Sequence, residues 1–191
     1  MGVREYDCQP PPTPNPASRF AALARTRPHE GEGNRIDSFK PTGTQQPMTS
    51  QADIVRAARG WLGTPYVHQA SLKGVGTDCL GLVRGVWREV LGEEPEVAPP
   101  YAPGWAEEGA GEALAGAAGR HLVEIPCTEF QAGDVLLFRW RPHLAAKHAG
   151  IAVSRGHMVH AQEQAVVTEI ALSAWWLRHL AFAFRFPGVT S

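Results

Sequence analysis

The hydrophobic pattern of this chain changes its period once, and that change limits the folds it can adopt. From Thr49 to Leu91, apolar residues recur every three to four positions, as on one face of an α-helix. From Gly133 onward, short apolar runs alternate with turn residues, as in β-strands. Helices followed by a run of strands predict an α+β fold, in which N-terminal helices pack on an antiparallel sheet of five to six strands.

Two helices are expected in the first half of the chain. The first begins at Ser50, which has Asp53 three residues later in a variant of the capping box, and it ends by Gly63 and Pro65. The second begins near Asp78. The residues expected to face the core are Ile54, Ala57, Ala58, Trp61 and Leu62 in the first helix, and Leu80, Val83, Trp87, Val90 and Leu91 in the second.

The second half is expected to supply the sheet. Its predicted strands cover residues 133–140, 148–156, 157–162, 165–170 and 180–186. The segment "LSAWWLRH" predicts a short helix or a turn between the last two strands, and "EEGAGEALAGAAGRHL" predicts a small alanine-rich helix before the first. The segment "TPYVHQASLKGVGT" is expected to be a loop.

Residues 1–47 differ in composition from the rest of the chain. They are rich in Pro, Gly, Thr, Asn and Gln and poor in aliphatic residues, so they cannot bury enough surface to offset their ordering entropy. We expect them to be disordered or to form a docking arm. Residues 48–191 are expected to form one domain, and Met48 is a candidate for the true translation start.

Composition excludes several classes of function. The formal net charge is −1, from 18 basic and 19 acidic residues, whereas a nucleic-acid binder normally carries a clustered basic surface. The N-terminus lacks the apolar segment of a signal peptide, and no apolar run reaches the roughly 18–20 residues of a membrane span. We therefore expect a protein made in the cytoplasm without a signal peptide, with no membrane span and no nucleic-acid partner. No C-x-x-C pair is present, and nothing in the sequence indicates a cofactor.

Cys79 is the first candidate for a reactive group. It follows Asp78 directly, at the start of the second helix, where unpaired backbone N–H groups and the helix dipole favour an anion. Asp78 is interpreted as the N-cap of this helix. The position predicts a stabilised thiolate. The alternative is a small, buried, unreactive side chain.

Two histidines strengthen the interpretation of Cys79 as a nucleophile. His148 begins one predicted strand and His160 ends the next, so antiparallel pairing would bring them side by side. A cysteine, a histidine and a polar residue that orients the histidine are sufficient for covalent acyl transfer. Two alternatives stay open. The histidines could bond only to backbone or water, or the three side chains could be zinc ligands.

The ordered motifs resemble a known family. The segments "GWLGTPYVHQ", "GTDCLGLVRGVW", "AGDVLLFR", "KHAGIAV" and "MVHA" are similar, in this order, to the NlpC-type cell-wall peptidases, which are compact relatives of papain. The resemblance covers roughly residues 50–187. The "DCLG" and "FRFP" forms resemble the phage-tail and gene-transfer-agent branch, whose domains ride on the particle tip. Leu80 departs from the pattern, because a serine usually follows the cysteine.

The resemblance implies roles for four residues. Cys79 would be the nucleophile, His148 the general base and His160 the group that orients it. Tyr66 would help the Cys79 backbone N–H to bind the oxyanion. The resemblance implies no metal ligands.

The implied reaction is hydrolysis of amide bonds in peptidoglycan stem peptides, by an enzyme that is particle-associated and acts on the cell wall together with tail or particle proteins. The alternative from another class is a non-catalytic tail-tip or wall-binding module of the same fold. An acyltransferase is the alternative within the same class of chemistry.

Overall fold

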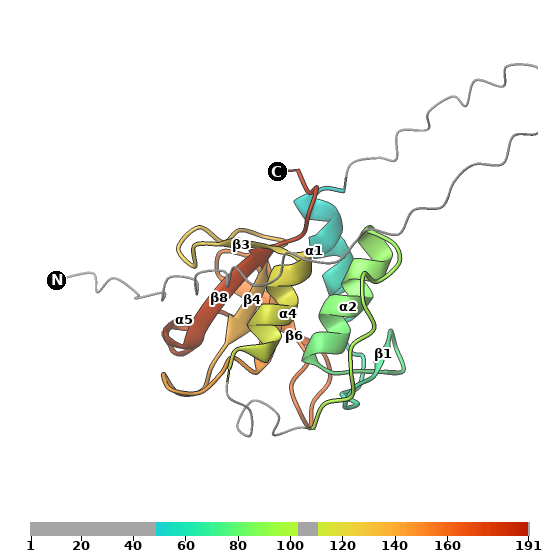
Figure 1. Ribbon diagram of the computed structural model, residues 1–191. Coiled ribbons are helices and arrows are strands. Elements are labelled where there is room, and N and C mark those ends of the chain that lie inside the picture. The colour runs from blue at the N-terminus through green and yellow to red at the C-terminus, as the bar shows by residue number, and fades with distance from the viewer. Residues whose placement is uncertain (1–48, 103–110, 191) are drawn as a thin grey trace, which may run out of the picture. The chain divides into compact units, whose positions relative to one another are not determined.

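The computed structural model describes residues 49–102 and 111–190, and it has the α+β architecture expected from the sequence (Figure 1). Within these residues the helices are α1 (Gln51–Arg59), α2 (Cys79–Val90), α4 (Ala113–His121) and α5 (Ala174–His179). The strands are β1 (Ser71–Leu72), β2 (Gly76–Thr77), β3 (Val123–Ile125), β4 (Val135–Phe138), β5 (His148–Ser154), β6 (His157–His160), β7 (Thr168–Ala171) and β8 (Leu180–Arg185).

The main sheet has six antiparallel strands in the order β3-β8-β4-β5-β6-β7. The last strand of the chain, β8, therefore lies inside the sheet between β3 and β4. The strands from β4 to β7 follow one another in both sequence and space. This confirms the expected α+β class with a sheet of five to six strands.

The sheet is covered on both faces. Helices α1 and α2 pack together and against β5, and α4 packs against β8 (Figure 1). Strand β4 shows how the two faces alternate, as a pleated strand requires. Its residues Val135 and Leu137 join the core under these three helices, whereas Leu136 and Phe138 join a second core that α5 covers with Trp176.

Both predicted helix starts are confirmed. The Ser50 hydroxyl accepts a bond from the Asp53 backbone N–H, and the Asp53 carboxylate accepts one from the Ser50 N–H, which completes the capping box of α1. At α2, the Asp78 carboxylate accepts a bond of 2.7 Å from the Gly81 N–H. Asp78 is therefore the N-cap, as expected.

The predicted buried faces of the helices are only partly correct. Trp61 is 2% exposed, but its neighbour Leu62 is 43% exposed, because α1 ends at Arg59 and the chain turns away. In α2 the most buried large side chains are Leu82, Val83 and Val86. The expected residues Leu80, Trp87, Val90 and Leu91 are half-buried around them.

Gly85 explains why α2 can lie so close to the end of α1. A Cβ atom at position 85 would lie 2.0 Å from Cζ2 of the buried Trp61 ring. We predict that Gly85→Ala lowers the free energy of unfolding by about 1–3 kcal/mol, the usual cost of overpacking a core. Urea unfolding measures this change.

Gly119→Ala is the matched control for this prediction. Its Cβ would make an ordinary contact with Phe184 at 3.9 Å, so the better helix propensity of alanine should raise stability by up to about 1 kcal/mol. Equal effects of the two substitutions would contradict the account of Gly85.

Two elements differ from the sequence-based expectation. The segment expected to be a loop contains the hairpin β1–β2, and an additional strand, β3, pairs with β8 at the edge of the sheet. The expected arm, residues 1–47, and Met48 lie outside the described residues, so those predictions are not tested. Among residues 49–102 and 111–190, no helix is long and apolar enough to cross a bilayer.

Candidate active site

The thiol of Cys79 lies against the first residues of β5. Cys79 is the first residue of α2, and it is a free, half-buried cysteine. Its Sγ lies 4.0 Å from the carbonyl oxygen of Lys147, and it also accepts a hydrogen bond from the backbone N–H of Ala149. The sulfur is therefore held beside the residues on both sides of His148.

The structure brings His148 and His160 together. Nε2 of His148 lies 2.9 Å from Nδ1 of His160, and the two residues are 7% and 1% exposed. The pairing of β5 with β6 places His160 opposite Gly150, two residues from His148. Because Nε2 of His148 faces His160, Nδ1 is the ring nitrogen that this pair does not use.

Gly150, opposite His160 in the sheet, packs closely against β6. A Cβ atom at this position would lie 2.7 Å from Sδ of Met158 and 3.5 Å from Cβ of His160. A side chain here would displace the end of the Met158 side chain and press on the Val159 carbonyl oxygen at 3.3 Å. The expectation that a strand start and a strand end would place these histidines side by side is confirmed, although their catalytic roles stay predictions.

Two tryptophans enclose the histidine pair, and the sequence analysis did not identify them. Trp176 of α5 contacts both rings, with centroid distances of 5.6 Å to His148 and 5.4 Å to His160. Trp140, just after β4, stacks on His148 at 5.6 Å and 28°. The adjacent pair "WW" in a short helix was the available signal, but only the fold shows which face of α5 meets the histidines.

Burial keeps these groups neutral. It lowers the pKa of His160 to about 4, and burial followed by the neighbouring His160 lowers the pKa of His148 to about 3. Burial, and then the negative charge of Asp78, raise the pKa of the Cys79 thiol to about 11, although backbone N–H groups act in the opposite direction. The expectation that the helix terminus would lower this pKa is wrong, because desolvation outweighs the helix end.

Tyr66 lies in the same neighbourhood. Burial raises the pKa of its hydroxyl to about 12, and the charges of Asp78 and Cys79 contribute next. The hydroxyl is therefore protonated at neutral pH and can donate a hydrogen bond. The backbone fixes this residue from two sides, because Tyr66 N–H donates to the Ala165 carbonyl and Val67 N–H donates to the Thr77 carbonyl.

Asp78 organises the loop in front of Cys79. Besides capping α2, its carboxylate accepts hydrogen bonds from the Gln69 backbone N–H, at 2.7 Å, and from the Tyr101 hydroxyl. His68 lies beside it, with Nδ1 at 3.6 Å from Oδ2, and its Nε2 lies 2.8 Å from the Tyr101 carbonyl oxygen. The loop that carries Tyr66 is thus tied to the start of α2.

The buried histidines predict a pH-dependent stability. Because the folded pKa of each lies below the ordinary 6.5, the unfolded chain takes up protons first as the pH falls, and stability is lost below pH 6.5. At pH 5 the loss is about 2 kcal/mol for one histidine. Urea unfolding at pH 7 and pH 5 should show a smaller difference in His160→Gln than in the wild type. The exposed His157, changed to Gln, should leave the difference intact, and an unchanged difference in His160→Gln would contradict the prediction.

The alternative of a zinc site does not fit the geometry. Within the part of the chain that the structure describes, no group of three or more His, Cys, Asp or Glu side chains is arranged to hold a metal ion. Cys79, His148 and His160 therefore do not form a ligand set.

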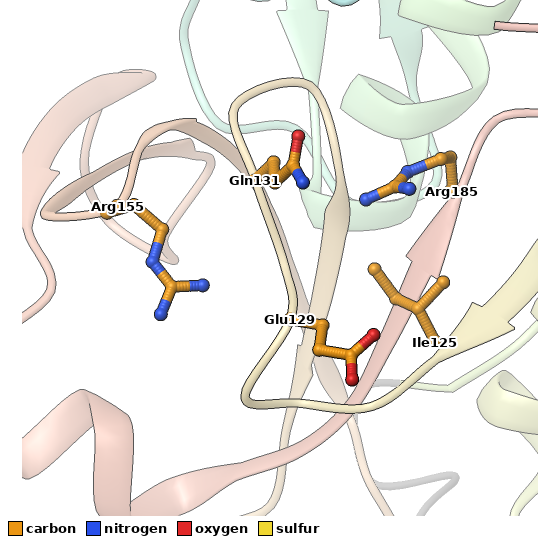
Figure 2. Close-up of a pocket in the computed structure, with 5 residues that line it drawn as sticks. All are labelled: Ile125, Glu129, Gln131, Arg155 and Arg185. Atoms are coloured by element: carbon orange, nitrogen blue, oxygen red, sulfur yellow. The ribbon is translucent and has the colours of Figure 1, made fainter. Parts of the chain in front are cut away.

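A separate cavity, of about 390 Å³, is lined by other residues, namely Ile125, Glu129, Gln131, Arg155 and Arg185 (Figure 2). Its two arginines are already bound. Arg185 forms two hydrogen bonds with Asp134, and Arg155 donates to the carbonyl oxygens of Thr128 and Phe130. This cavity has no part in the thiol–histidine arrangement.

Comparisons with known proteins identify relatives of this chain. The γ-DL-glutamyl hydrolase of Bacillus subtilis (strain 168) is 29% identical over 147 residues, which cover 75% of this chain and 31% of that protein. An NlpC/P60 family protein from Bacillus cereus ATCC 10987 has a similar fold, with a TM-score of 0.52, 21% identity, and coverage of 73% of this chain and 41% of that one. The chain therefore spans less than half the length of either relative.

A third relative matches over its whole length. The NlpC/p60 domain of the peptidoglycan hydrolase SagA has a TM-score of 0.51 and 24% identity, over 72% of this chain and 100% of that domain. At this identity the likeness shows the fold alone. The match to the NlpC/P60 family covers residues 63–185. This stretch includes Tyr66, Cys79, His148 and His160. The chain belongs to the NlpC/P60 family.

Proposed function

We propose that this protein is a cysteine hydrolase that cleaves amide bonds in the stem peptides of peptidoglycan. The proposal depends on how Cys79, His148 and His160 are arranged. The Cys79 thiol contacts the backbone on both sides of His148, and His160 occupies the far nitrogen of that imidazole. In this arrangement Cys79 is the nucleophile, His148 is the general base and His160 is the orienting residue.

The first half of the reaction forms an acyl-enzyme. The Cys79 thiol is neutral at rest, so its proton passes to Nδ1 of His148 as the sulfur attacks the carbonyl carbon. The negative charge on the carbonyl oxygen is stabilised by the Cys79 backbone N–H and the Tyr66 hydroxyl, and such donors contribute about 2.7–4 kcal/mol each in other enzymes. The His148 imidazolium then gives its proton to the leaving amine.

The second half releases the acid. Neutral His148 takes a proton from water as the water oxygen attacks the thioester carbonyl, and the proton returns to the sulfur as the C–S bond breaks. His160 keeps the ring of His148 in one orientation through both halves, since it binds the nitrogen that takes no part in proton transfer.

The proposed substrate rests on the relatives. One is named a γ-DL-glutamyl hydrolase and another a peptidoglycan hydrolase. We infer that the scissile bond is an amide of the stem peptide, with the γ-glutamyl bond as the first candidate. Mass spectrometry of muropeptides digested with the purified chain tests this proposal. Undigested muropeptides from several wall types would overturn it.

The proposed setting is the tip of a phage tail or a gene-transfer agent. It rests on the "DCLG" and "FRFP" segments. Residues 1–47 would then be the arm that binds tail or particle proteins. Copurification of the full chain with particles, and its loss when residues 1–47 are deleted, tests this part.

A non-catalytic wall-binding module is the second candidate. The raised pKa of the Cys79 thiol favours it, because a resting thiol is a weaker nucleophile than a thiolate. Such a module would sediment with sacculi and release no soluble fragments. Release of fragments by the wild type alone, with Cys79→Ala inactive, decides for the enzyme.

A further inference from the structure

Tyr101 follows α2 in the chain, and both its side chain and its backbone bind residues around Cys79. Its hydroxyl donates a hydrogen bond to the carboxylate of Asp78, a residue that is 2% exposed. Its carbonyl oxygen accepts a bond of 2.7 Å from Nε2 of Gln69 and lies 2.8 Å from Nε2 of His68. Tyr101 therefore connects the loop before α2 with the first turn of that helix.

The backbone of Gln69 shows that this connection restrains the loop. Its φ of +62° lies in the left-handed region, which residues other than glycine seldom adopt. Such a conformation persists only where the surrounding contacts fix it. The Gln69 backbone N–H donates to Asp78 at 2.7 Å, and its side-chain amide donates to the Tyr101 carbonyl oxygen. Since Gln69 lies three positions after Tyr66, the same bonds restrain the position of Tyr66.

The Asp78 carboxylate is a buried charge next to the thiol. After burial itself, this charge is the next cause that raises the pKa of Cys79, so the carboxylate opposes formation of the thiolate. It accepts hydrogen bonds from the backbone N–H groups of Gly81 and Gln69 and from the Tyr101 hydroxyl. Each donor places a positively polarised hydrogen against the carboxylate and so offsets part of its charge.

The Tyr101 hydroxyl keeps its proton and stays a donor at neutral pH. Burial, then the hydrogen bond to Asp78 and the charge of this carboxylate, raise the pKa of Tyr101 well above its ordinary value. The charge of Cys79 acts in the same direction, so the hydroxyl is within electrostatic reach of the sulfur. His68 also faces the carboxylate, with Nδ1 at 3.6 Å from Oδ2, and the charge of Asp78 acts on Tyr66 as well.

We propose that Tyr101 is a positioning residue of the thiol site, whose hydroxyl holds the Asp78 carboxylate in place and offsets part of its charge beside the Cys79 sulfur. Tyr101 acts through Asp78 and takes no part in bond formation itself. The proposal rests on the proposed function in treating Cys79 as the nucleophile. The reactivity of the thiol measures the effect without a peptidoglycan substrate.

Alkylation of Cys79 by iodoacetamide at pH 8 tests the proposal on the full chain. The thiolate displaces iodide, so a C–S bond forms as the C–I bond breaks, and the rate follows the fraction of thiolate. Tyr101→Phe removes the hydroxyl but keeps the backbone carbonyl and the ring, which packs edge-on against His68 with the centroids 5.1 Å apart. We expect the rate, measured by mass spectrometry of the Cys79 peptide, to fall at least about threefold, since one pKa unit corresponds to a tenfold change in thiolate.

Asp78→Asn separates an effect of charge from a general loss of structure. Asparagine is an equally good N-cap, so the start of α2 should be kept. Removal of the charge should speed alkylation at least about threefold. In this background, adding Tyr101→Phe should change the rate less than about 1.5-fold, because no charge is left for the hydroxyl to offset.

Ser71→Ala is the matched control. It removes a hydroxyl that donates to the Gly81 carbonyl oxygen of the same helix, at 2.6 Å, and the alkylation rate should stay at the wild-type value. Where the chain cleaves muropeptides, Tyr101→Phe should lower kcat about as much as the alkylation rate and leave KM unchanged. Thermal unfolding verifies the fold of each variant.

The outcomes separate this proposal from the preceding one. An unchanged or faster alkylation rate in Tyr101→Phe overturns it, as does an equal loss in the Asp78→Asn background. If Tyr101→Phe does not fold, an unchanged or slower rate in Asp78→Asn overturns it instead. If the alkylation rates are as expected but muropeptides stay intact, the hydrolase proposal fails and the role of Tyr101 stands. If muropeptides are cleaved while Tyr101→Phe reacts like the wild type, only the role of Tyr101 fails.

Discussion

Cys79→Ala is expected to lower the rate of muropeptide cleavage by at least about 1,000-fold, because it removes the atom that would form the acyl-enzyme. The fold should survive. The side chain is small and half-buried, and its sulfur contacts only backbone groups of Lys147 and Ala149 among its polar neighbours named above. Fragment release is measured by mass spectrometry, and thermal unfolding of the same preparations verifies the fold.

Cys79→Ser sharpens this test, because the hydroxyl keeps the size and polarity of the site but is a much weaker nucleophile at neutral pH. It should be nearly as inactive as Cys79→Ala. Alkylation with iodoacetamide should inactivate the wild type, whereas a metal chelator should not. Cleavage that persists in both variants would reject Cys79 as the nucleophile.

His148→Ala is expected to lower kcat/KM by about 100- to 10,000-fold, the range that a positioned general base contributes. His160→Gln should cost less, up to about 100-fold, because the amide can still bond to Nε2 of His148 but holds the ring less firmly. His157→Gln is the control, since His157 is an exposed histidine of the same strand.

The order of these three effects is the informative result. A base at His148 and an orienting group at His160 require His148→Ala to be the most damaging and His157→Gln to be neutral. If His160→Gln proved more damaging than His148→Ala, the roles of the two histidines would have to be exchanged.

The elements that the sequence predicted well depend on local chemistry. The capping box of Ser50 and Asp53 and the N-cap of Asp78 involve residues within three positions of one another, so a linear pattern contains them. The three-residue strand β3 was not predicted, because its place depends on pairing with β8, about sixty residues later. The hairpin β1–β2 was missed for a similar reason, since each of its strands has two residues.

The site shows the same division. The pairing of His148 with His160 follows from neighbouring strands and a short turn, and the sequence predicted it. The contacts of Trp140 and Trp176 with His148 join separate parts of the chain, and no spacing rule indicates them. The pKa of Cys79 was predicted in the wrong direction, because burial depends on everything that packs around the sulfur.

The position of β8 has a consequence for when activity can arise. This strand is made last in the domain, yet it lies inside the sheet, between the edge strand β3 and β4. Until the ribosome has released it, β4 lacks one neighbour and the apolar side chains Phe182 and Phe184 are missing from the core. An unfinished nascent chain thus contains Cys79, His148 and His160 without a completed sheet to hold them together, so the proposed activity can arise only after this last strand has been added.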